Sequence, residues 1–387
     1  MPTTNPIPCP YPLSLLRLKM KLKVVFCWSD ISGYMAACWW KLHETAEIEV
    51  FVVAFQALTE TAFGDRLMQG IPCRLLDLQE RQDPQLVKQL VIAEQPDAIV
   101  IGGWLHQPYC KLTATPEFQK TAFVMGMDTP WQDTWRQRLA PLVLKSYLQR
   151  MDRVVVTGER SWQYAKQLGI DPARIDRGLY GIDYDGWVPM YERRSQSVWP
   201  RSFLFIGRYI PVKAIDVLVS AYQAYRERVD RPWDLVCCGQ GELKSQLAGQ
   251  PGISDRGFLQ PSEMASVWQS AGAFILPSRF DPWPLAIVEA AAAGLPIICT
   301  DACGSGVEVV RSWYNGLVIP EDDIAQLTQA LLNLHDRHAQ LPLWGQRSQQ
   351  LAAPYATQVW VDRWRSLLQQ AVNPQFTATS VQRVSTT

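Results

Sequence analysis

Residues 277–296 read Pro277-Ser278-Arg279-Phe280-Asp281-Pro282-Trp283-Pro284-Leu285-Ala286-Ile287-Val288-Glu289-Ala290-Ala291-Ala292-Ala293-Gly294-Leu295-Pro296. Pro284 suits the first turn of a helix and Gly294 is typical of a helix end, so a helix of roughly ten residues is expected between them. Asp281 then lies in the preceding loop, and Glu289 lies roughly 7–8 Å further along the helix axis. Two carboxylates at that separation can hold hydroxyls at the two ends of one extended polar ligand.

Glu289 is unusual for its surroundings, because Leu285, Val288 and four consecutive alanines lie around it in the sequence. A carboxylate in such a helix is costly unless it finds partners. The alternative is an ordinary buried helix that carries Glu289 on its solvent-exposed edge. The stretch alone does not separate these two interpretations.

Short apolar runs alternate with longer amphipathic segments along the chain. The runs cover residues 23–28, 49–54, 98–102, 121–125 and 153–157 in the first half, and 202–207, 234–238, 273–276 and 296–300 in the second. This alternation predicts an α/β protein with parallel, doubly wound sheets.

A break in the pattern at residues 185–201, where Gly, Pro, Ser and Gln gather, predicts a linker between two lobes. The lobes are expected at residues 20–190 and 200–350, with a last amphipathic helix at 356–372 that joins the first lobe. Two Rossmann-like lobes that face each other place a ligand in the central cleft, at the carboxyl ends of the strands.

The composition excludes several classes of function. The 387 residues include 37 basic and 37 acidic side chains, so no charge excess favours nucleic acid. No apolar run is long enough to span a membrane, and residues 1–19 and 373–387 are expected to be disordered. The nine cysteines form no Cys-x-x-Cys pair, which favours reduced thiols and a cytoplasmic location. His335 and His338 lack ligand partners at metal-site spacing, so no metal and no cofactor are expected.

A second constellation spans residues 203–213, where an apolar run ends at Gly207 and Arg208 and Lys213 follow. A helix is expected to begin near Lys213, and a lysine opposes the dipole at a helix N-terminus. A bound diphosphate would reverse that penalty, because both cations and the helix amides would point at one dianion. The alternative is two surface cations near a turn. Further glycine-rich strand exits follow at Gly239 and ahead of Phe258.

These motifs, taken in order, resemble the carboxyl-terminal half of a retaining glycosyltransferase of the GT-B fold, family 4. The resemblance is close over residues 203–335 and loose over 20–190. It rests on Gly207-Arg208 with Lys213, Cys238-Gly239 with Gly241, Gly257-Phe258-Leu259, Asp281 with Glu289, and Asn315-Gly316-Leu317-Val318.

The resemblance implies that this lobe binds a nucleotide-diphosphate sugar. Arg208 and Lys213 would hold the diphosphate, Glu289 the ribose and Asp281 the donor sugar, while Gly207, Gly239 and Phe258 would line the nucleotide. The sequence departs from the family at three positions. It has Asp281 where Glu is usual, and Pro284 and Ala214 where Gly is usual.

In the first lobe, which the resemblance assigns to the acceptor, three residues follow predicted strands. Gly33 occupies the place of the family's glycine-rich loop, although it also suits a simple tight turn. His106 and Asp128 are rival candidates for the polar group beside the donor sugar. A surface histidine and a helix N-cap are the respective alternatives. The basic stretch 136–153 favours a solvated helix face over docking on an anionic membrane.

The expected activity is transfer of a sugar to an acceptor hydroxyl with retention of anomeric configuration, in synthesis of a glycan or cell-envelope precursor. The acceptor would be a glycan, a lipid-linked sugar or a small molecule, with at most peripheral membrane contact. A sugar epimerase or phosphorylase of the same fold is the first alternative. A catalytically degenerate protein that only binds nucleotide sugars is the second, because of Pro284 and Ala214.

Overall fold

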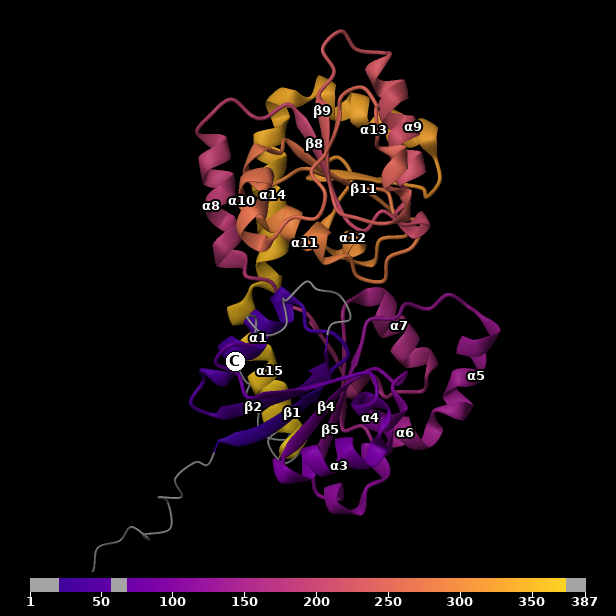
Figure 1. Cartoon of the computed structure of the whole chain (residues 1–387), viewed down its shortest axis with the longest axis vertical. Helices are drawn as coiled ribbons and strands as arrows, with labels where there is room; N and C mark the ends of the chain where they lie inside the picture. The colour runs from indigo at the N-terminus through magenta and orange to yellow at the C-terminus, as the bar shows by residue number, and fades with distance from the viewer. Residues whose placement is uncertain (1–20, 57–67, 374–387) are drawn as a thin grey trace, which may run out of the picture.

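Two parallel β-sheets with helices packed on them form the two lobes of the protein, which lie one above the other in Figure 1. The computed structural model describes residues 21–56 and 68–373. The expected disorder of residues 1–19 and of the tail after residue 373 falls outside the described residues. The expectation of an α/β protein with two Rossmann-like lobes is confirmed.

The N-terminal lobe is built on a seven-stranded sheet in the order β3-β2-β1-β4-β5-β6-β7. Its strands are β1 (Leu22–Cys27), β2 (Ile48–Phe55), β3 (Cys73–Leu76), β4 (Ala98–Gly102), β5 (Ala122–Met127), β6 (Arg153–Val156) and β7 (Ile175–Arg177). Its helices are α1 (Gly33–His43), α3 (Pro84–Ala93), α4 (Gln107–Lys111), α5 (Trp135–Val143), α6 (Lys145–Gln149) and α7 (Glu159–Gln167). Separate apolar clusters pack on the two faces of this sheet.

The C-terminal lobe is built on a six-stranded sheet in the order β10-β9-β8-β11-β12-β13. Its strands are β8 (Ser202–Ile206), β9 (Asp234–Cys238), β10 (Ile253–Asp255), β11 (Ala273–Leu276), β12 (Ile297–Thr300) and β13 (Gly316–Ile319). Its helices are α8 (Tyr184–Ser195), α9 (Ile215–Arg226), α10 (Pro261–Ser270), α11 (Leu285–Ala292), α12 (Gly304–Val309), α13 (Ile324–Asp336) and α14 (Leu341–Ala352).

Each sheet has a point where the strand order reverses. It lies between β1 and β4 in the first lobe and between β8 and β11 in the second. The register places Val24 beside both Val50 and Ala98, and Phe203 beside both Leu235 and Ala273. Ligands of such sheets bind outside the carboxyl ends of the strands at this reversal.

The predicted linker at residues 185–201 is wrong in its first part, because α8 occupies Tyr184–Ser195. Its Arg194 is fully buried and donates hydrogen bonds to the carbonyls of Ala293, Gly294 and Trp268. The guanidinium thus satisfies carbonyl groups around the ends of α11 and α10. Glycine and proline in this segment predicted a break, whereas a buried tertiary contact makes it a helix.

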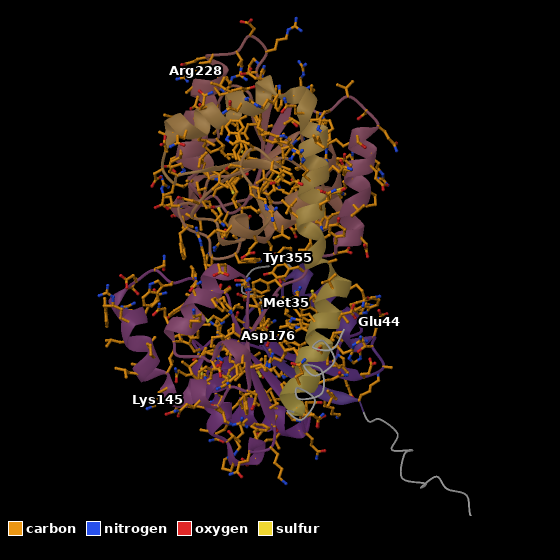
Figure 2. The ribbon with its side chains drawn as sticks, turned by 180° about the vertical axis from the view of Figure 1, so that it is seen from behind. Met35, Glu44, Lys145, Asp176, Arg228 and Tyr355 are labelled. Carbon is orange, nitrogen blue, oxygen red and sulfur yellow. The ribbon has the colours of Figure 1, made fainter. Side chains whose placement is uncertain are left out.

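The last helix, α15 (Thr357–Val372), packs on the N-terminal lobe. The indole groups of Trp360 and Trp364 stack on each other and donate to the carbonyls of Leu179 and Gly178. Tyr355 lies at the junction of the two lobes, just ahead of this helix (Figure 2). No helix among the described residues is long and apolar enough to cross a membrane.

Candidate functional site

Two loops at the reversal point of the C-terminal sheet bring the predicted residues together. One loop leaves β8 and carries Arg208 and Lys213, and the other leaves β11 and carries Asp281. A backbone hydrogen bond from Arg279 to the carbonyl of Val212, at 2.8 Å, ties the loops to each other. The neighbouring strands therefore deliver charged side chains from distant parts of the sequence to one edge.

Lys213 and Asp281 form a direct ion pair, and their side chains are only 15% and 13% exposed. The resemblance had assigned the lysine to a diphosphate and the aspartate to a sugar. In the structure the two groups neutralise each other instead. Water hardly reaches a pair of this kind. Removal of either partner therefore leaves the other charge unpaired and poorly solvated, which is costly.

Arg208 differs from the other arginine of these loops. Its side chain is exposed and makes no ion pair with any residue in the described ranges 21–56 and 68–373. Arg279, by contrast, is held by Asp216 and Asp322, each at 2.6 Å. Arg208 is therefore the cation of this edge that can bind an incoming anion without breaking an existing contact.

Ala214 has left-handed backbone angles, with φ of 53° and ψ of 44°, directly before α9. A residue with a Cβ atom pays roughly 1–2 kcal/mol for this conformation, and glycine does not. The turn that presents Lys213 is therefore strained at the position where the family usually has glycine. Pro284, the other departure, is the N-cap residue of α11, and its carbonyl accepts a hydrogen bond from Ser305.

Glu289 lies in the middle of α11, as predicted, on the side that faces the N-terminal lobe. Its carboxylate has no hydrogen-bond partner among the described residues, and it lies within electrostatic reach of Tyr34 across the lobe boundary. Burial raises the pKa of Glu289 from its ordinary value to about 7. A half-buried carboxylate without partners is suited to accept hydrogen bonds from ligand hydroxyls.

The glycines of the neighbouring strand exits have a packing role. A Cβ atom on Gly239 would lie 1.9 Å from the carbonyl oxygen of Gly207, so the β9 exit approaches the β8 exit as closely as backbone allows. The amide of Gly239 also donates to the carbonyl of Gly257, at 2.8 Å. Phe258 follows that residue and is 42% exposed, so its ring remains at the protein surface.

A cavity of about 510 Å³ opens at the matching edge of the N-terminal sheet, where β1, β4 and β5 end. Its wall combines backbone at Gly102 and Gly126 with the rings of Trp28 and Tyr180. Polar backbone and aromatic faces together suit a sugar-like ring.

Asp128 is the carboxylate of this cavity. Tyr180 donates a hydrogen bond to it at 3.0 Å, and Tyr34 packs edge-on against Tyr180 at 5.6 Å between ring centroids. Burial raises the pKa of Asp128, the bond from Tyr180 acts in the opposite direction, and the negative charge of Asp281 in the other lobe adds to the rise. Neither Tyr180 nor Tyr34 was predicted from the sequence, because no motif marks Tyr180 and Tyr34 is one of many aromatic residues.

His106 does not line this cavity. It is the N-cap residue of α4, and its ring packs against Phe55 and Tyr109 at centroid distances of 4.7 and 4.3 Å. Burial lowers the pKa of its imidazole. Gly33, the remaining candidate of this lobe, is the exposed first residue of α1. The structure thus brings Asp128, and not His106, towards the residues of the second lobe.

Direct contacts hold the two lobes face to face. The backbone amide of Glu159 donates to Glu308 at 2.7 Å, and Arg160 donates to the carbonyl of Asp301. Within the described part of the chain no group of three or more His, Cys, Asp or Glu side chains is arranged to bind a metal ion.

The family match found by comparison with known proteins lies in the C-terminal lobe. Residues 200–337 match the family described as "Glycosyl transferases group 1". An exopolysaccharide phosphotransferase of Streptomyces coelicolor is 28% identical over 241 residues, which cover 60% of this chain and 24% of that protein. A D-inositol 3-phosphate glycosyltransferase of Rhodococcus opacus is 28% identical over 258 residues, which cover 62% of this chain and 58% of that protein. The chain thus spans between about a quarter and somewhat more than half of these relatives' lengths.

Solved structures resemble the whole two-lobed molecule. The Anabaena protein Alr3699/HepE, in complex with UDP, has a TM-score of 0.72 at 14% identity and covers 90% of this chain and 100% of its own. Sucrose-phosphate synthase from Thermosynechococcus elongatus has a TM-score of 0.71 at 15% identity and covers 93% of this chain and 100% of its own. At such identities the likeness shows the fold alone, which is the GT-B arrangement of two lobes.

Proposed function

We propose that this protein is a glycosyltransferase that moves a sugar from a nucleotide-diphosphate donor to an acceptor hydroxyl, with retention of anomeric configuration. One observation carries the proposal. Arg208 and Glu289, which lack partners among the described residues, share one edge of the C-terminal lobe with the Lys213–Asp281 pair. Asp281 lies within electrostatic reach of Asp128, the carboxylate of the cavity in the other lobe. The family match of residues 200–337 and the GT-B fold support it.

In this proposal the diphosphate binds between the β8 exit and the start of α9. Arg208 contacts it without losing an earlier partner, and Lys213 exchanges part of its contact with Asp281 for a phosphate oxygen. Asp281 is then free to accept a hydroxyl of the donor sugar. Two cations at a strand edge stabilise the negative charge that the diphosphate gains when it leaves.

Glu289 takes the ribose of the nucleotide. Both ribose hydroxyls are hydrogen-bond donors, and the carboxylate accepts them best in its ionised form. Because the pKa of Glu289 is about 7, nucleotide binding is expected to favour the ionised form and to lower that pKa.

The acceptor binds in the cavity of the N-terminal lobe, with Asp128 as the polar group beside the reacting hydroxyl. The bond from the sugar's anomeric carbon to the diphosphate breaks as the acceptor oxygen bonds to the same face, and the hydroxyl proton passes to the departing phosphate. Positioning and electrostatic stabilisation supply most of the rate in such a scheme.

The test begins with calorimetric titration of nucleoside diphosphates. UDP is the first probe, because the fold neighbour from Anabaena was solved with UDP. Slow hydrolysis of the matching nucleotide sugar in the absence of acceptor is the second readout. Binding together with hydrolysis supports the proposal. Binding without hydrolysis or transfer indicates the degenerate protein, an isomerised sugar indicates an epimerase, and strict dependence on inorganic phosphate indicates a phosphorylase. Absence of binding to any nucleoside diphosphate contradicts the proposed site.

A further inference from the structure

Helix α5 carries its apolar side chains on the face that points away from the protein. Trp135, Leu139, Leu142 and Val143 are 68%, 47%, 74% and 79% exposed. Their spacing of four, three and one residues places them on one side of a helix. A surface helix normally turns such a stripe towards the core.

A polar residue fixes the helix in this orientation. Gln137 is buried, donates to the carbonyl of Pro130 at 2.8 Å and accepts from the amide of Gln132 at 2.7 Å. These bonds satisfy the buried amide and hold the inner face of α5 against the preceding loop. The outward position of the apolar stripe therefore follows from specific contacts on the opposite face.

Helix α5 also borders the cavity of Asp128. Leu105, which is 90% exposed, lines that cavity together with Arg136 and Ala140 of α5. In Figure 1, α5 lies at the outer rim of the N-terminal lobe, beyond α6 and α7. We call the surface made by Leu105, Trp135, Leu139, Leu142 and Val143 the α5 face. It adjoins the mouth of the cavity that we assign to the acceptor.

Two cations, Arg136 and Lys145, lie beside the apolar residues of the α5 face in the sequence. Residues 135–151 contain three arginines and one lysine, and no aspartate or glutamate. Arg138 pairs with Asp133 at 2.7 Å and Arg150 with Asp152 at 3.5 Å. Arg136 stacks on the ring of Trp135, with 5.4 Å to its centroid. Neither Arg136 nor Lys145 makes an ion pair with any side chain in the described ranges.

We propose that the α5 face docks on the surface of an anionic lipid bilayer. An exposed apolar stripe that includes tryptophan, next to unpaired cations, has the chemistry of a helix that lies in a membrane interface. A second copy of the chain fits less well, because a twofold contact through this helix sets the same cations opposite one another. Docking in this way places the mouth of the cavity at the headgroup layer.

Sedimentation with lipid vesicles tests the proposal, and it is performed without nucleotide or acceptor so that its result does not depend on the proposed transfer reaction. The full chain is expected to sediment with phosphatidylcholine vesicles that contain phosphatidylglycerol, and not with phosphatidylcholine alone. High salt should weaken the binding, since the attraction is partly electrostatic.

Two pairs of variants locate the contact. Val143→Glu should weaken vesicle binding by at least about tenfold, since it removes an apolar contact and adds a repelled charge. Val198→Glu is its control, because Val198 is 85% exposed in the other lobe. Lys145→Ala should weaken binding by about fivefold. Arg228→Ala, at the far end of the molecule in Figure 2, should not.

Three results would overturn the proposal. One is absence of binding to anionic vesicles, and another is an equal loss for Val143→Glu and Val198→Glu. The third is a protein that does not bind vesicles but forms a dimer, seen by light scattering, which Val143→Glu converts to a monomer. Unchanged circular dichroism and melting temperature in each variant show that the fold is retained.

Discussion

The two sheet edges that face each other in this protein share one backbone geometry and differ in chemistry. The reversal point of the C-terminal sheet presents Arg208, Lys213 and Asp281, whereas that of the N-terminal sheet presents glycine backbone, aromatic rings and Asp128. A charged edge suits a diphosphate, and an aromatic cavity suits a sugar ring. The comparison teaches that the fold places both sheet edges at one cleft, while the residues of the loops give each edge its own chemistry.

The largest effect is expected from Lys213→Ala. Loss of a charge-assisted contact to a poorly solvated diphosphate costs roughly 1.5–3 kcal/mol, and the substitution also leaves Asp281 unpaired. Turnover should fall by at least about a hundredfold. Lys88→Ala is the control, because Lys88 also forms an ion pair, with Glu117 at 2.8 Å, in the other lobe. Near-normal turnover in Lys213→Ala would show that the charged edge is not the diphosphate site.

The next largest effect on turnover should distinguish Asp128 from His106, the two rival candidates of the N-terminal lobe. Asp128→Asn keeps the shape of the side chain and the bond from Tyr180 but removes the charge, so turnover should fall by roughly ten- to a hundredfold. His106→Asn should mainly lower the melting temperature, because His106 packs between Phe55 and Tyr109. Steady-state turnover and the melting temperature are measured for both variants. The opposite pattern would return the role to His106.

Glu289→Gln should stabilise the ligand-free protein and weaken nucleotide binding. The pKa of Glu289 is raised from 4.5 to about 7, so between these pH values the folded state holds a proton that the unfolded state has released. The free energy of unfolding therefore falls as the pH rises through this window. Denaturant titrations should show that Glu289→Gln raises the free energy of unfolding by roughly 1–3 kcal/mol at pH 8 and by less at pH 5.

Glu227→Gln is the matched control, because Glu227 is an exposed residue at the end of α9. It should leave the pH dependence of stability unchanged. An equal gain for Glu289→Gln at both pH values would show that the carboxylate does not titrate near neutrality in the folded protein.

The smallest effect is expected from Ala214→Gly. Relief of the left-handed conformation at Ala214 should add about 1 kcal/mol to the free energy of unfolding, or about 1 °C to the melting temperature of a chain of this length. The same substitution at Ala248, an exposed residue after η6 (Glu242–Gln246), is the control and should not stabilise. A loss of stability in Ala214→Gly would show that this turn is not strained.

The central strands were predictable and the edge strands were not. All nine strands predicted from apolar runs are present, and the four that were missed, β3, β7, β10 and β13, are the outer strands of the two sheets. Strands β3, β7 and β10 contain three or four residues each and are partly exposed, so they lack the continuous apolar run of a strand buried on both faces. Strand β13, in contrast, is apolar and mostly buried, and it was missed although its sequence carries such a run.

The charged part of the site was predictable because its residues follow strands at readable spacings. The contact of Lys213 with Asp281 was not, since it joins positions 68 residues apart through the packing of two loops. Tyr180 follows an edge strand without any motif. For the basic stretch 136–153 the sequence favoured a solvated helix face over membrane docking, because its charges were readable and the outward position of its apolar side chains, which follows from the contacts of Gln137, was not.

Titration of UDP into three variants tests most directly the claim that one lobe holds the nucleotide and the other the acceptor. Arg208→Ala removes an exposed, unpaired cation of the charged edge, Asp128→Asn alters the cavity of the other lobe, and Arg228→Ala is a distant control. The division predicts that Arg208→Ala weakens UDP binding by about tenfold or more, while the other two bind as the wild type does. Equal weakening in Arg208→Ala and Asp128→Asn, or none in Arg208→Ala, would contradict it.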